Sequence, residues 1–215
     1  MINRTLLVLS LCLPATAWCA TSDETRCKNG NAAACASAGR ARIDSKEYAL
    51  AKPLLEKGCK HGSVDACDDL GWIYDDGLGE AVDKVMAEKL YAKACAGNFA
   101  RGCTNQGAMY LGTEGIAKDL KKAVALFDKA CAAKSMTGCR NLGMHYLQGD
   151  GVPKDALKAR KLFEDACEAE QAASCSDLAD MDSKGLGGPV NKAKAKTLWA
   201  QSCKLGNQKA CDLAK

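Results

Sequence analysis

The chain has 215 residues, of which 47% are hydrophobic and 26% charged, with a formal net charge of +4. Lysines and acidic residues are interleaved, and no basic stripe of the kind that neutralises phosphates is present, so nucleic acid is not expected as a partner. Fourteen cysteines and only two histidines set the main question, which is whether the cysteines form disulfides or hold a metal.

The first residues have the pattern of a secretory signal peptide. Residues 1–4 carry one positive charge, residues 6–13 are apolar, and small residues follow Pro14. Such a segment is too short to span a bilayer as a helix and is removed on export. No later segment is apolar enough to cross a membrane, so we expect an exported protein that is periplasmic or secreted.

The cysteine count helps to choose the cleavage site. Cleavage after Ala17 satisfies the small-x-small rule but leaves Cys19 as an odd thiol. Cleavage after Cys19 leaves twelve cysteines, so residues 1–19 are predicted to be the signal peptide. Lipidation of Cys19 is an alternative, which the bulky Trp18 before it disfavours.

The twelve remaining cysteines form six pairs, and within each pair the second cysteine follows the first by eight residues. From Cys59 onward the pairs recur every 36 residues, which indicates a solenoid of stacked repeats. The pairs are Cys27 and Cys35, Cys59 and Cys67, Cys95 and Cys103, Cys131 and Cys139, Cys167 and Cys175, and Cys203 and Cys211.

This spacing requires the chain to reverse inside each pair. Residues eight apart in one helix are separated by about 12 Å, which no disulfide spans. Three residues after the first cysteine, four pairs carry a residue that tolerates the left-handed conformation, and Lys134 and Glu170 hold that position in the other two. The four are Gly30, Gly62, Asn98 and Gly206.

Each disulfide is therefore predicted to join the second helix of one repeat to the first helix of the next. Zinc is the competing interpretation, but it needs shorter cysteine spacings or more histidines than His61 and His145. We expect structural disulfides formed in an oxidising compartment, with no metal and no cofactor.

One repeat, residues 104–139, shows the frame. Gly107 and Tyr110 lie in a first helix, residues 112–119 form a loop, and Asp119 is placed to cap a second helix. In the second helix, one face is apolar at the spacing i, i+3, i+4, i+7. That face consists of Ala123, Leu126, Phe127 and Ala130.

The frame recurs along the chain. A small residue lies four positions after each of the first five second cysteines and is expected to let a neighbouring helix approach closely. These residues are Gly39, Gly71, Gly107, Gly143 and Ala179. Tyr74, Tyr110 and Tyr146 follow three positions later, and Asp182 takes that place in the fifth unit, whose helix is expected to be looser or to carry a different surface.

Together these patterns predict an all-α fold, a right-handed α/α superhelical solenoid of antiparallel helix pairs stapled by disulfides. Residues 20–215 are expected to form a single solenoid of about five repeats. Only a turn or so, up to Cys27, precedes the first pair, and a short capping helix is expected from about Gln208 to Ala214. The first unit departs from the frame because it has Pro53 inside its second helix.

Residues 142–167 read LGMHYLQGDGVPKDALKARKLFEDAC and resemble a Sel1-like repeat, a short relative of the tetratricopeptide repeat. The resemblance covers nearly all of the chain after residue 19. The added paired cysteines are similar to those of the Helicobacter cysteine-rich protein family, whose repeats carry a disulfide of this spacing. The resemblance implies either a scaffold that binds proteins or peptides, or penicillin binding with weak β-lactam hydrolysis.

The sequence gives no catalytic residue to support hydrolysis. The motifs S-x-x-K, K-T-G, S-D-N, H-E-x-x-H and G-x-S-x-G are absent. His145 is the one histidine within a predicted helix and is expected to lie on the surface or to be partly buried. An enzyme with a β-lactam or a peptidoglycan-derived ligand therefore remains the alternative function.

We expect a monomeric protein- or peptide-binding module that acts as an envelope adaptor, a host-interaction factor or an immunity protein against an exported toxin. In such solenoids the first helices line a concave face. The predicted exposed binding residues on that face are Asp68, Asp69, Trp72, Asp76, Asn105, Arg140, Asn141, Met144, Gln148, Asp177 and Asp180. The alternative is that Trp72 packs between helices and the aspartates form a solvated face.

Overall fold

The computed structural model describes residues 22–215, so the predicted signal peptide lies outside the described residues. Within this range the chain forms twelve helices and no strand. They are α1 (Ser22–Lys28), α2 (Ala32–Asp44), α3 (Tyr48–Lys60), α4 (Val64–Asp76), α5 (Lys84–Ala96), α6 (Ala100–Met109), α7 (Leu120–Ala132), α8 (Met136–Gln148), α9 (Ala156–Glu168), α10 (Ala172–Lys184), α11 (Lys192–Lys204) and α12 (Gln208–Leu213).

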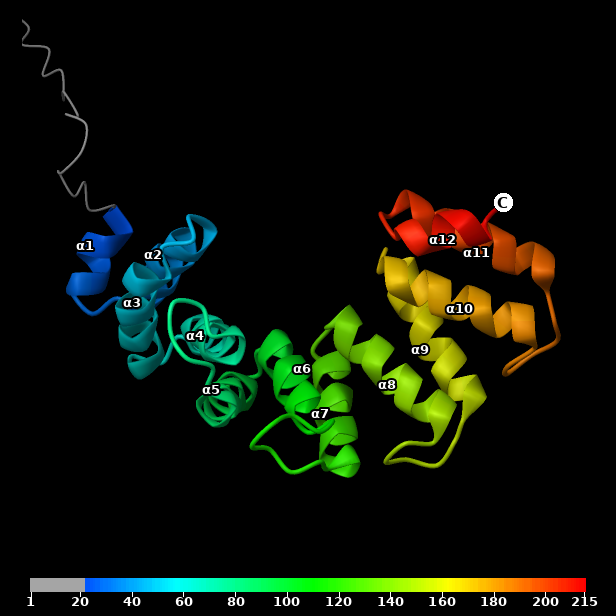
Figure 1. Cartoon of the computed structure of the whole chain (residues 1–215), viewed down its shortest axis with the longest axis horizontal. Helices are drawn as coiled ribbons and strands as arrows, with labels where there is room; N and C mark the ends of the chain where they lie inside the picture. The colour runs from blue at the N-terminus through cyan, green and yellow to red at the C-terminus, as the bar shows by residue number, and fades with distance from the viewer. Residues whose placement is uncertain (1–21) are drawn as a thin grey trace, which may run out of the picture.

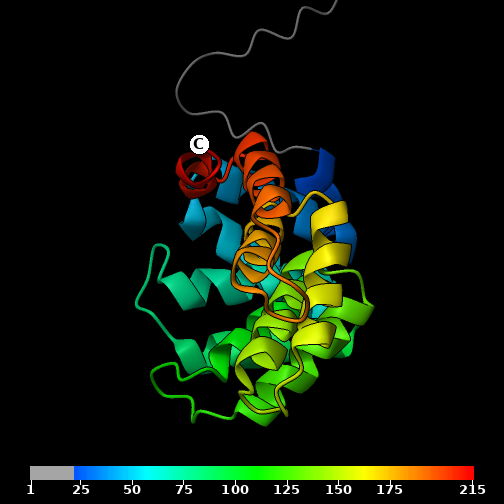
Figure 2. The ribbon, with the colours of Figure 1, turned by 90° about the vertical axis from the view of Figure 1, so that its right-hand side faces the viewer.

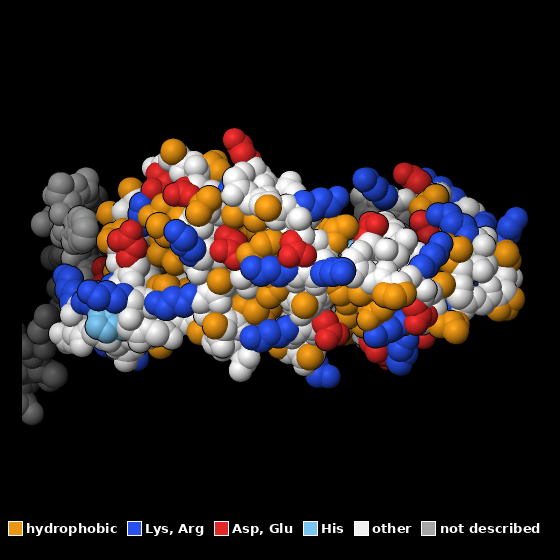
Figure 3. Space-filling view, turned by 90° about the horizontal axis from the view of Figure 1, so that it is seen from below, with side chains coloured by type: hydrophobic (Ala, Val, Ile, Leu, Met, Phe, Trp, Pro, Cys, Tyr) orange, Lys and Arg blue, Asp and Glu red, His pale blue; other side chains and the backbone are white. Residues whose placement is uncertain are grey.

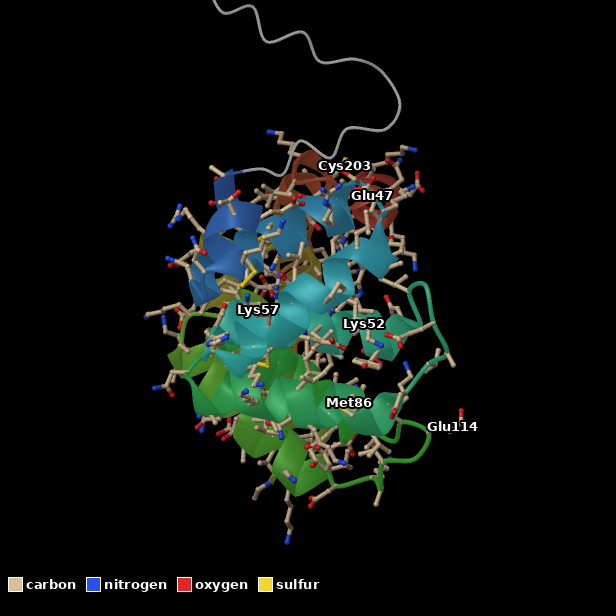
Figure 4. All side chains as sticks on the ribbon, turned by 90° about the vertical axis from the view of Figure 1, so that its left-hand side faces the viewer. Glu47, Lys52, Lys57, Met86, Glu114 and Cys203 are labelled. Carbon is tan, nitrogen blue, oxygen red and sulfur yellow. A yellow bond between two sulfur atoms is a disulfide. The ribbon has the colours of Figure 1, made fainter. Side chains whose placement is uncertain are left out.

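Each helix packs against the next one in the chain, so the predicted antiparallel pairs are α2–α3, α4–α5, α6–α7, α8–α9 and α10–α11. The pairs stack into the predicted right-handed solenoid, which curves into an arch (Figure 1). The first helices also contact across repeats, α2 with α4 and α6 with α8, as expected for the inner side of a curve. The loops after α4 and α6 project from one edge of the arch (Figure 2), and Glu114 lies far out on that edge (Figure 4).

Both ends of the solenoid carry a short helix. The chain before the first pair forms the seven-residue helix α1, which is longer than the predicted turn or so. At the other end, α12 spans Gln208–Leu213, close to the predicted capping helix. In the first unit, α3 continues through Pro53 to Lys60.

All six predicted disulfides are present, and they join α1 to α2, α3 to α4, α5 to α6, α7 to α8, α9 to α10 and α11 to α12. The Cα atoms of each pair lie between 4.4 Å (Cys95 and Cys103) and 4.7 Å (Cys167 and Cys175) apart. The residue three positions after each first cysteine has positive φ, including Lys134 (67°) and Glu170 (60°). Such a conformation costs a non-glycine residue about 1–2 kcal/mol, so the reversal is imposed by the repeat itself.

The predicted close approach of helices at the small residues is confirmed. A Cβ on Gly107 would lie 2.7 Å from Cε1 of Phe127, and one on Gly143 would lie 2.6 Å from Cε1 of Phe163. Phe127 and Phe163 have no solvent exposure. In the first four repeats, a large side chain of the second helix therefore packs directly on a glycine of the first helix.

The expectation of a looser fifth unit is wrong. Asp182 is only 3% exposed and accepts a hydrogen bond from Nη1 of Arg160 at 2.6 Å. The same guanidinium donates from Nη2 to the carbonyl of Leu186 (2.9 Å) and from Nε to that of Gly187 (3.1 Å). An arginine from the preceding repeat thus binds both the helix and the loop after it. The carboxylate of Asp182 can be buried there because it is paired with this arginine.

Candidate binding surface

The aspartates predicted to be exposed at the start of α4 are buried. Asp68 is 1% exposed and Asp69 is 4% exposed. The prediction placed them on the surface because they are charged and lie on the first helix of a repeat. A buried charge requires a partner of opposite charge and full hydrogen bonding, and both are found in neighbouring repeats.

Two arginines from different repeats neutralise these carboxylates. Asp69 accepts hydrogen bonds from Nε of Arg40 on α2 (2.6 Å) and from Nη2 of Arg101 on α6 (2.5 Å). Asp68 pairs with Nε of Arg101 and accepts from Nδ2 of Asn105 at 3.0 Å. The network therefore links the first helices of three consecutive repeats.

Burial decides the titration of both carboxyl groups. Loss of solvent raises the pKa of Asp68 above its ordinary value, although the charge of Arg101 and its hydrogen bond oppose this. Burial likewise raises the pKa of Asp69 against the attraction of Arg40 and Arg101. For Arg101, burial alone would lower the pKa, but the charges of Asp68 and Asp69 leave it raised. The cluster therefore favours the charged form of Arg101 and makes both carboxyl groups harder to ionise.

The outer parts of both arginines border a hollow of about 430 Å³ on the inner side of the arch. The Arg40 and Arg101 side chains are 41% and 44% exposed, and among the described residues no hydrogen bond or ion pair uses the Nη1 atom of either one, although the Arg101 guanidinium lies over the ring of Phe99. Trp72, which is 37% exposed, forms an apolar part of the wall. The full lining is Arg40, Ile43, Asp44, Asp68, Asp69, Trp72, Arg101 and Asn105. We call this hollow the tryptophan hollow.

A second hollow, of about 290 Å³, lies two repeats further along and is called here the methionine hollow. It collects the predicted residues Asn141, Met144 and Gln148 of α8, and its wall also includes Leu111, which is 41% exposed. The full lining is Leu111, Lys118, Leu120, Phe127, Asn141, Met144, His145, Gln148 and Asp150.

His145 forms the inner wall of the methionine hollow. It is 8% exposed, its ring lies 5.6 Å from that of Phe127, and its Nδ1 lies 2.8 Å from the carbonyl oxygen of Asp150. The ring therefore fixes the loop after α8 to the core of the previous repeat.

The two hollows occupy the same register of the repeat. Trp72 and Met144 both lie five residues after the second cysteine of their pair, and Ile43 and Leu111 both lie eight residues after theirs. Equivalent positions in a solenoid lie on one face. The structure thus brings the predicted residues of α4 and α8 to one face as two separate hollows.

The remaining predicted residues lie outside the hollows. Arg140 on α8 donates from Nε to Asp177 on α10 at 2.5 Å, so these two residues join a pair of first helices. Asp180 accepts a hydrogen bond from Nε1 of Trp199 at 3.1 Å, and Asp76 is exposed at the end of α4.

The linings include residues that were not predicted to bind, among them Arg40, Ile43, Arg101 and Leu111. Arg40 lies at the register of Trp72 and Met144, so the repeat alignment could have found it. Arg101 lies two residues before its cysteine, and nothing in the local sequence shows that it reaches Asp68 and Asp69.

Other features of the described residues bear on the kind of site. Between residues 22 and 215, no three histidine, cysteine, aspartate or glutamate side chains gather as a metal site would require. None of the helices in that range has the length and apolar character needed to cross a membrane. The outer face of the arch mixes acidic and basic side chains (Figure 3). The inner hollows are therefore the strongest candidates for a binding site.

Fold and surface together define a disulfide-joined α/α repeat protein with a concave face suited to recognition. The family model for the Sel1 repeat matches residues 64–99, 102–135, 137–170 and 172–207, which is more than half of the chain. The chain belongs to the Sel1 repeat family, whose repeats generally mediate protein–protein interaction. The matched segments begin with α4, so the atypical first pair with Pro53 lies outside them.

Solved structures include several similar proteins. A Sel1 repeat protein from Oxalobacter formigenes is 27% identical, with a TM-score of 0.81 over 91% of this chain and 78% of that one. A protective antigen of uropathogenic Escherichia coli with an SLR fold is 24% identical, with a TM-score of 0.78 over 87% of this chain and 41% of that one.

Helicobacter pylori cysteine-rich protein B is 31% identical, with a TM-score of 0.49 over 63% of this chain and 98% of that one. No curated protein matches the chain.

Proposed function

We propose that the concave face binds an extended segment of another protein, so that the chain works as a recognition module. The observation that carries this proposal is the pair of equivalent hollows at Trp72 and Met144. Each combines an accessible apolar side chain with polar groups, which is the composition of protein interfaces. An adaptor, a host-interaction factor and an immunity protein against a toxin would all use such a face.

We also propose that the protein is exported to the periplasm or the exterior. Residues 1–19 would be removed as a signal peptide, and residues 20–215 would act as one solenoid. Six disulfides support this location because such bonds persist in oxidising compartments. Mass spectrometry of the protein from envelope fractions tests both points, since it gives the mature N-terminus and shows whether twelve cysteines resist alkylation.

No specific observation favours β-lactam hydrolysis. Among residues 22–215, no serine hydroxyl is hydrogen-bonded to a lysine, the arrangement that activates a nucleophilic serine in such enzymes. Hydrolysis is therefore not proposed. Incubating the oxidised protein with a chromogenic β-lactam would revise this if turnover followed the folded, oxidised state.

The recognition proposal can be tested without knowing the partner. A random peptide library displayed on phage is selected against the oxidised protein, and enriched peptides are then bound to Trp72→Ala, Met144→Ala and Leu157→Ala. Leu157 is a matched control because it is 69% exposed and apolar but lines neither hollow.

We expect enriched peptides that lose binding to Trp72→Ala or Met144→Ala and keep it with Leu157→Ala. Each truncation removes an apolar contact, so a loss of about tenfold or more is expected. Enriched peptides that bind all three variants equally would show that recognition does not use the concave face, and the proposal would be wrong.

A further inference from the structure

We infer that the ligand is an extended acidic peptide with two apolar side chains about six residues apart. The first would fill the tryptophan hollow beside a carboxylate bound by Arg40 and Arg101, and the second would fill the methionine hollow. This inference rests on the proposed function and adds the charge, the shape and the spacing of the ligand.

The charge follows from how the ion network is buried. The Asp68 and Asp69 side chains are 1% and 5% exposed, whereas Arg40 and Arg101 are 41% and 44% exposed. The carboxylates use the Nε and Nη2 atoms of the arginines, and Nη1 of each remains for another acceptor. The part of the network that a ligand meets therefore consists of guanidinium groups with a hydrogen-bond donor to spare.

Asp44 is the one exposed acid among the residues that line the tryptophan hollow. Asp44 is the last residue of α2, so two of the three exposed charged side chains in the lining are the arginines Arg40 and Arg101. A guanidinium binds a carboxylate through charge-assisted hydrogen bonds, and the fixed carboxylates hold Arg40 and Arg101 in place before the ligand arrives. A ligand carboxylate thus meets ordered donors.

The apolar anchors follow from the side chains at the two equivalent positions. Trp72 is 37% exposed next to the buried Ile43, and Met144 lies next to Leu111, which is 41% exposed. An indole and a thioether both offer large contact areas, and methionine adapts to different partners. Each hollow suits one apolar side chain of a peptide.

The spacing follows from the repeat between the two hollows. There, Ala108 stands at the register of Trp72 and Met144, and Asp75 stands at the register of Ile43 and Leu111. Asp75 is held by Nζ of Lys84 at 2.6 Å. This joint lacks apolar side chains at both positions, so two anchors are offered two repeats apart and not one in every repeat.

Two repeats correspond to about 20 Å, because packed helices lie about 10 Å apart. An extended chain rises about 3.3 Å per residue, so about six residues separate the two anchors. Across this distance the amides of Asn105 and Asn141, at one register, offer hydrogen-bonding groups to a peptide backbone.

The test uses three fluorescein-labelled peptides and fluorescence anisotropy with the oxidised protein. The first has leucine next to aspartate at one end and a second leucine about six residues on, in a neutral polar background. The second replaces aspartate with lysine, and the third shortens the spacing to about three residues. Changing the charge in the peptide avoids Arg40 and Arg101, which also hold the buried aspartates.

We expect the first peptide to bind about tenfold more tightly than either of the others. Trp72→Ala and Met144→Ala should each reduce its affinity by a similar factor, and Leu157→Ala should leave it unchanged. Equal binding of the lysine peptide, equal binding of the short peptide, or no binding of the first peptide would each overturn the inference.

These outcomes are distinct from failure of the proposed function. If the phage selection yields peptides that depend on Trp72 or Met144 but are basic or carry one anchor, the concave face binds peptides and the inferred ligand is wrong. If no selected peptide depends on either residue, the proposed function fails, and the inference fails with it.

Discussion

Two joints between first helices use a carboxylate at the same register but bury it to different extents. On α4, Asp69 is 5% exposed in its side chain and is bound by arginines from both neighbouring repeats. On α10, Asp177 is 20% exposed and is bound by Arg140 alone, which is 31% exposed. Both aspartates lie two residues after the second cysteine of their pair.

The comparison shows that one position in a repeat can be a surface ion pair in one copy and a buried network in another. What differs is the number of arginines that neighbouring repeats supply. Desolvation costs a fully buried carboxylate more than it costs a partly exposed pair such as Arg140 and Asp177. The joint at α4 therefore gains order at its arginines and becomes sensitive to the charge on its acids, while the joint at α10 does not.

Removing one disulfide near each joint should have a large and equal effect. In the chain-entropy model a loop of this length contributes about 2.5 kcal/mol. We expect Cys59→Ala/Cys67→Ala and Cys167→Ala/Cys175→Ala each to lose about that much free energy of unfolding, measured in urea. Full reduction should unfold the chain, since six such losses reach the top of the stability range of an ordinary domain, about 5–15 kcal/mol.

A much smaller loss for the pair at Cys59 and Cys67 would mean that the ion network alone secures the α4 joint. The control for full reduction is the wild-type protein treated in the same way but without reductant. An unchanged thermal transition after full reduction would contradict the structural role of all six bonds.

Adding a methyl group at the helix contacts should also affect both regions alike. A Cβ at position 71 would lie 2.8 Å from Cδ1 of Tyr91, and one at position 143 would lie 2.6 Å from Cε1 of Phe163. We expect Gly71→Ala and Gly143→Ala each to destabilise the fold by about 1–3 kcal/mol through overpacking. Equal losses in thermal melts would mean that the two joints differ only in their electrostatics. A stabilised variant would show that the helix contact can accommodate an added methyl group.

Neutralising each carboxylate tests the comparison directly. Asp69→Asn replaces one of the two oxygens that accept hydrogen bonds from Arg40 and Arg101 with an amide NH2 group that cannot accept, and we expect a loss of about 1–2 kcal/mol, discounted because both arginines can turn to solvent. Asp177→Asn breaks a half-exposed pair and should cost less than about 1 kcal/mol. Urea unfolding of both variants at one pH compares the two losses in free energy of unfolding. A larger loss for Asp177→Asn would contradict the prediction that the carboxylate at the α4 joint contributes more to stability.

The smallest predicted effect is a pH dependence of stability that comes from the α4 joint. Burial raises the pKa of Asp68 and Asp69, so in the folded state they take up protons at a pH where the unfolded chain has not. Stability from these two groups therefore rises as pH falls through their raised pKa toward the ordinary value near 4.

Urea unfolding between neutral pH and about pH 4 should show wild type gaining stability relative to Asp68→Asn/Asp69→Asn. Leu157→Ala, which removes an exposed side chain that does not titrate, serves as the control and should track wild type across the range. If wild type instead loses stability relative to the double variant on acidification, the arginines outweigh burial and lower the two pKa values.

The repeat frame could be predicted from the sequence because its signals are local. The eight-residue cysteine spacing determines a chain reversal, and Asp119 caps α7 by accepting a hydrogen bond from the backbone of Lys122 at 3.0 Å, as predicted. Gly107 and Gly143 predict the close contacts with Phe127 and Phe163, because glycine disfavours a helix unless close packing offsets its cost.

The burial of charged residues could not be predicted because it depends on partners about one repeat away. Asp69 reaches arginines on α2 and α6, and Asp182 reaches Arg160 on α9. Nothing near these aspartates in the sequence shows that a cation will cover them. The expectation that Asp68 and Asp69 are exposed is therefore wrong, whereas the binding role of Trp72 and Met144, which line the two hollows, stays a prediction.

The placement of the disulfides divides the connections between helices into two kinds with different responses to a protease. The turns inside a cysteine pair, such as the one between Cys95 and Cys103, are closed rings, whereas the loops after α4, α6, α8 and α10 are open. A cut inside a ring leaves both fragments covalently attached, but a cut in an open loop leaves them joined only by packing. A molecule nicked between paired cysteines would therefore keep its full length on a non-reducing gel and its concave face in solution.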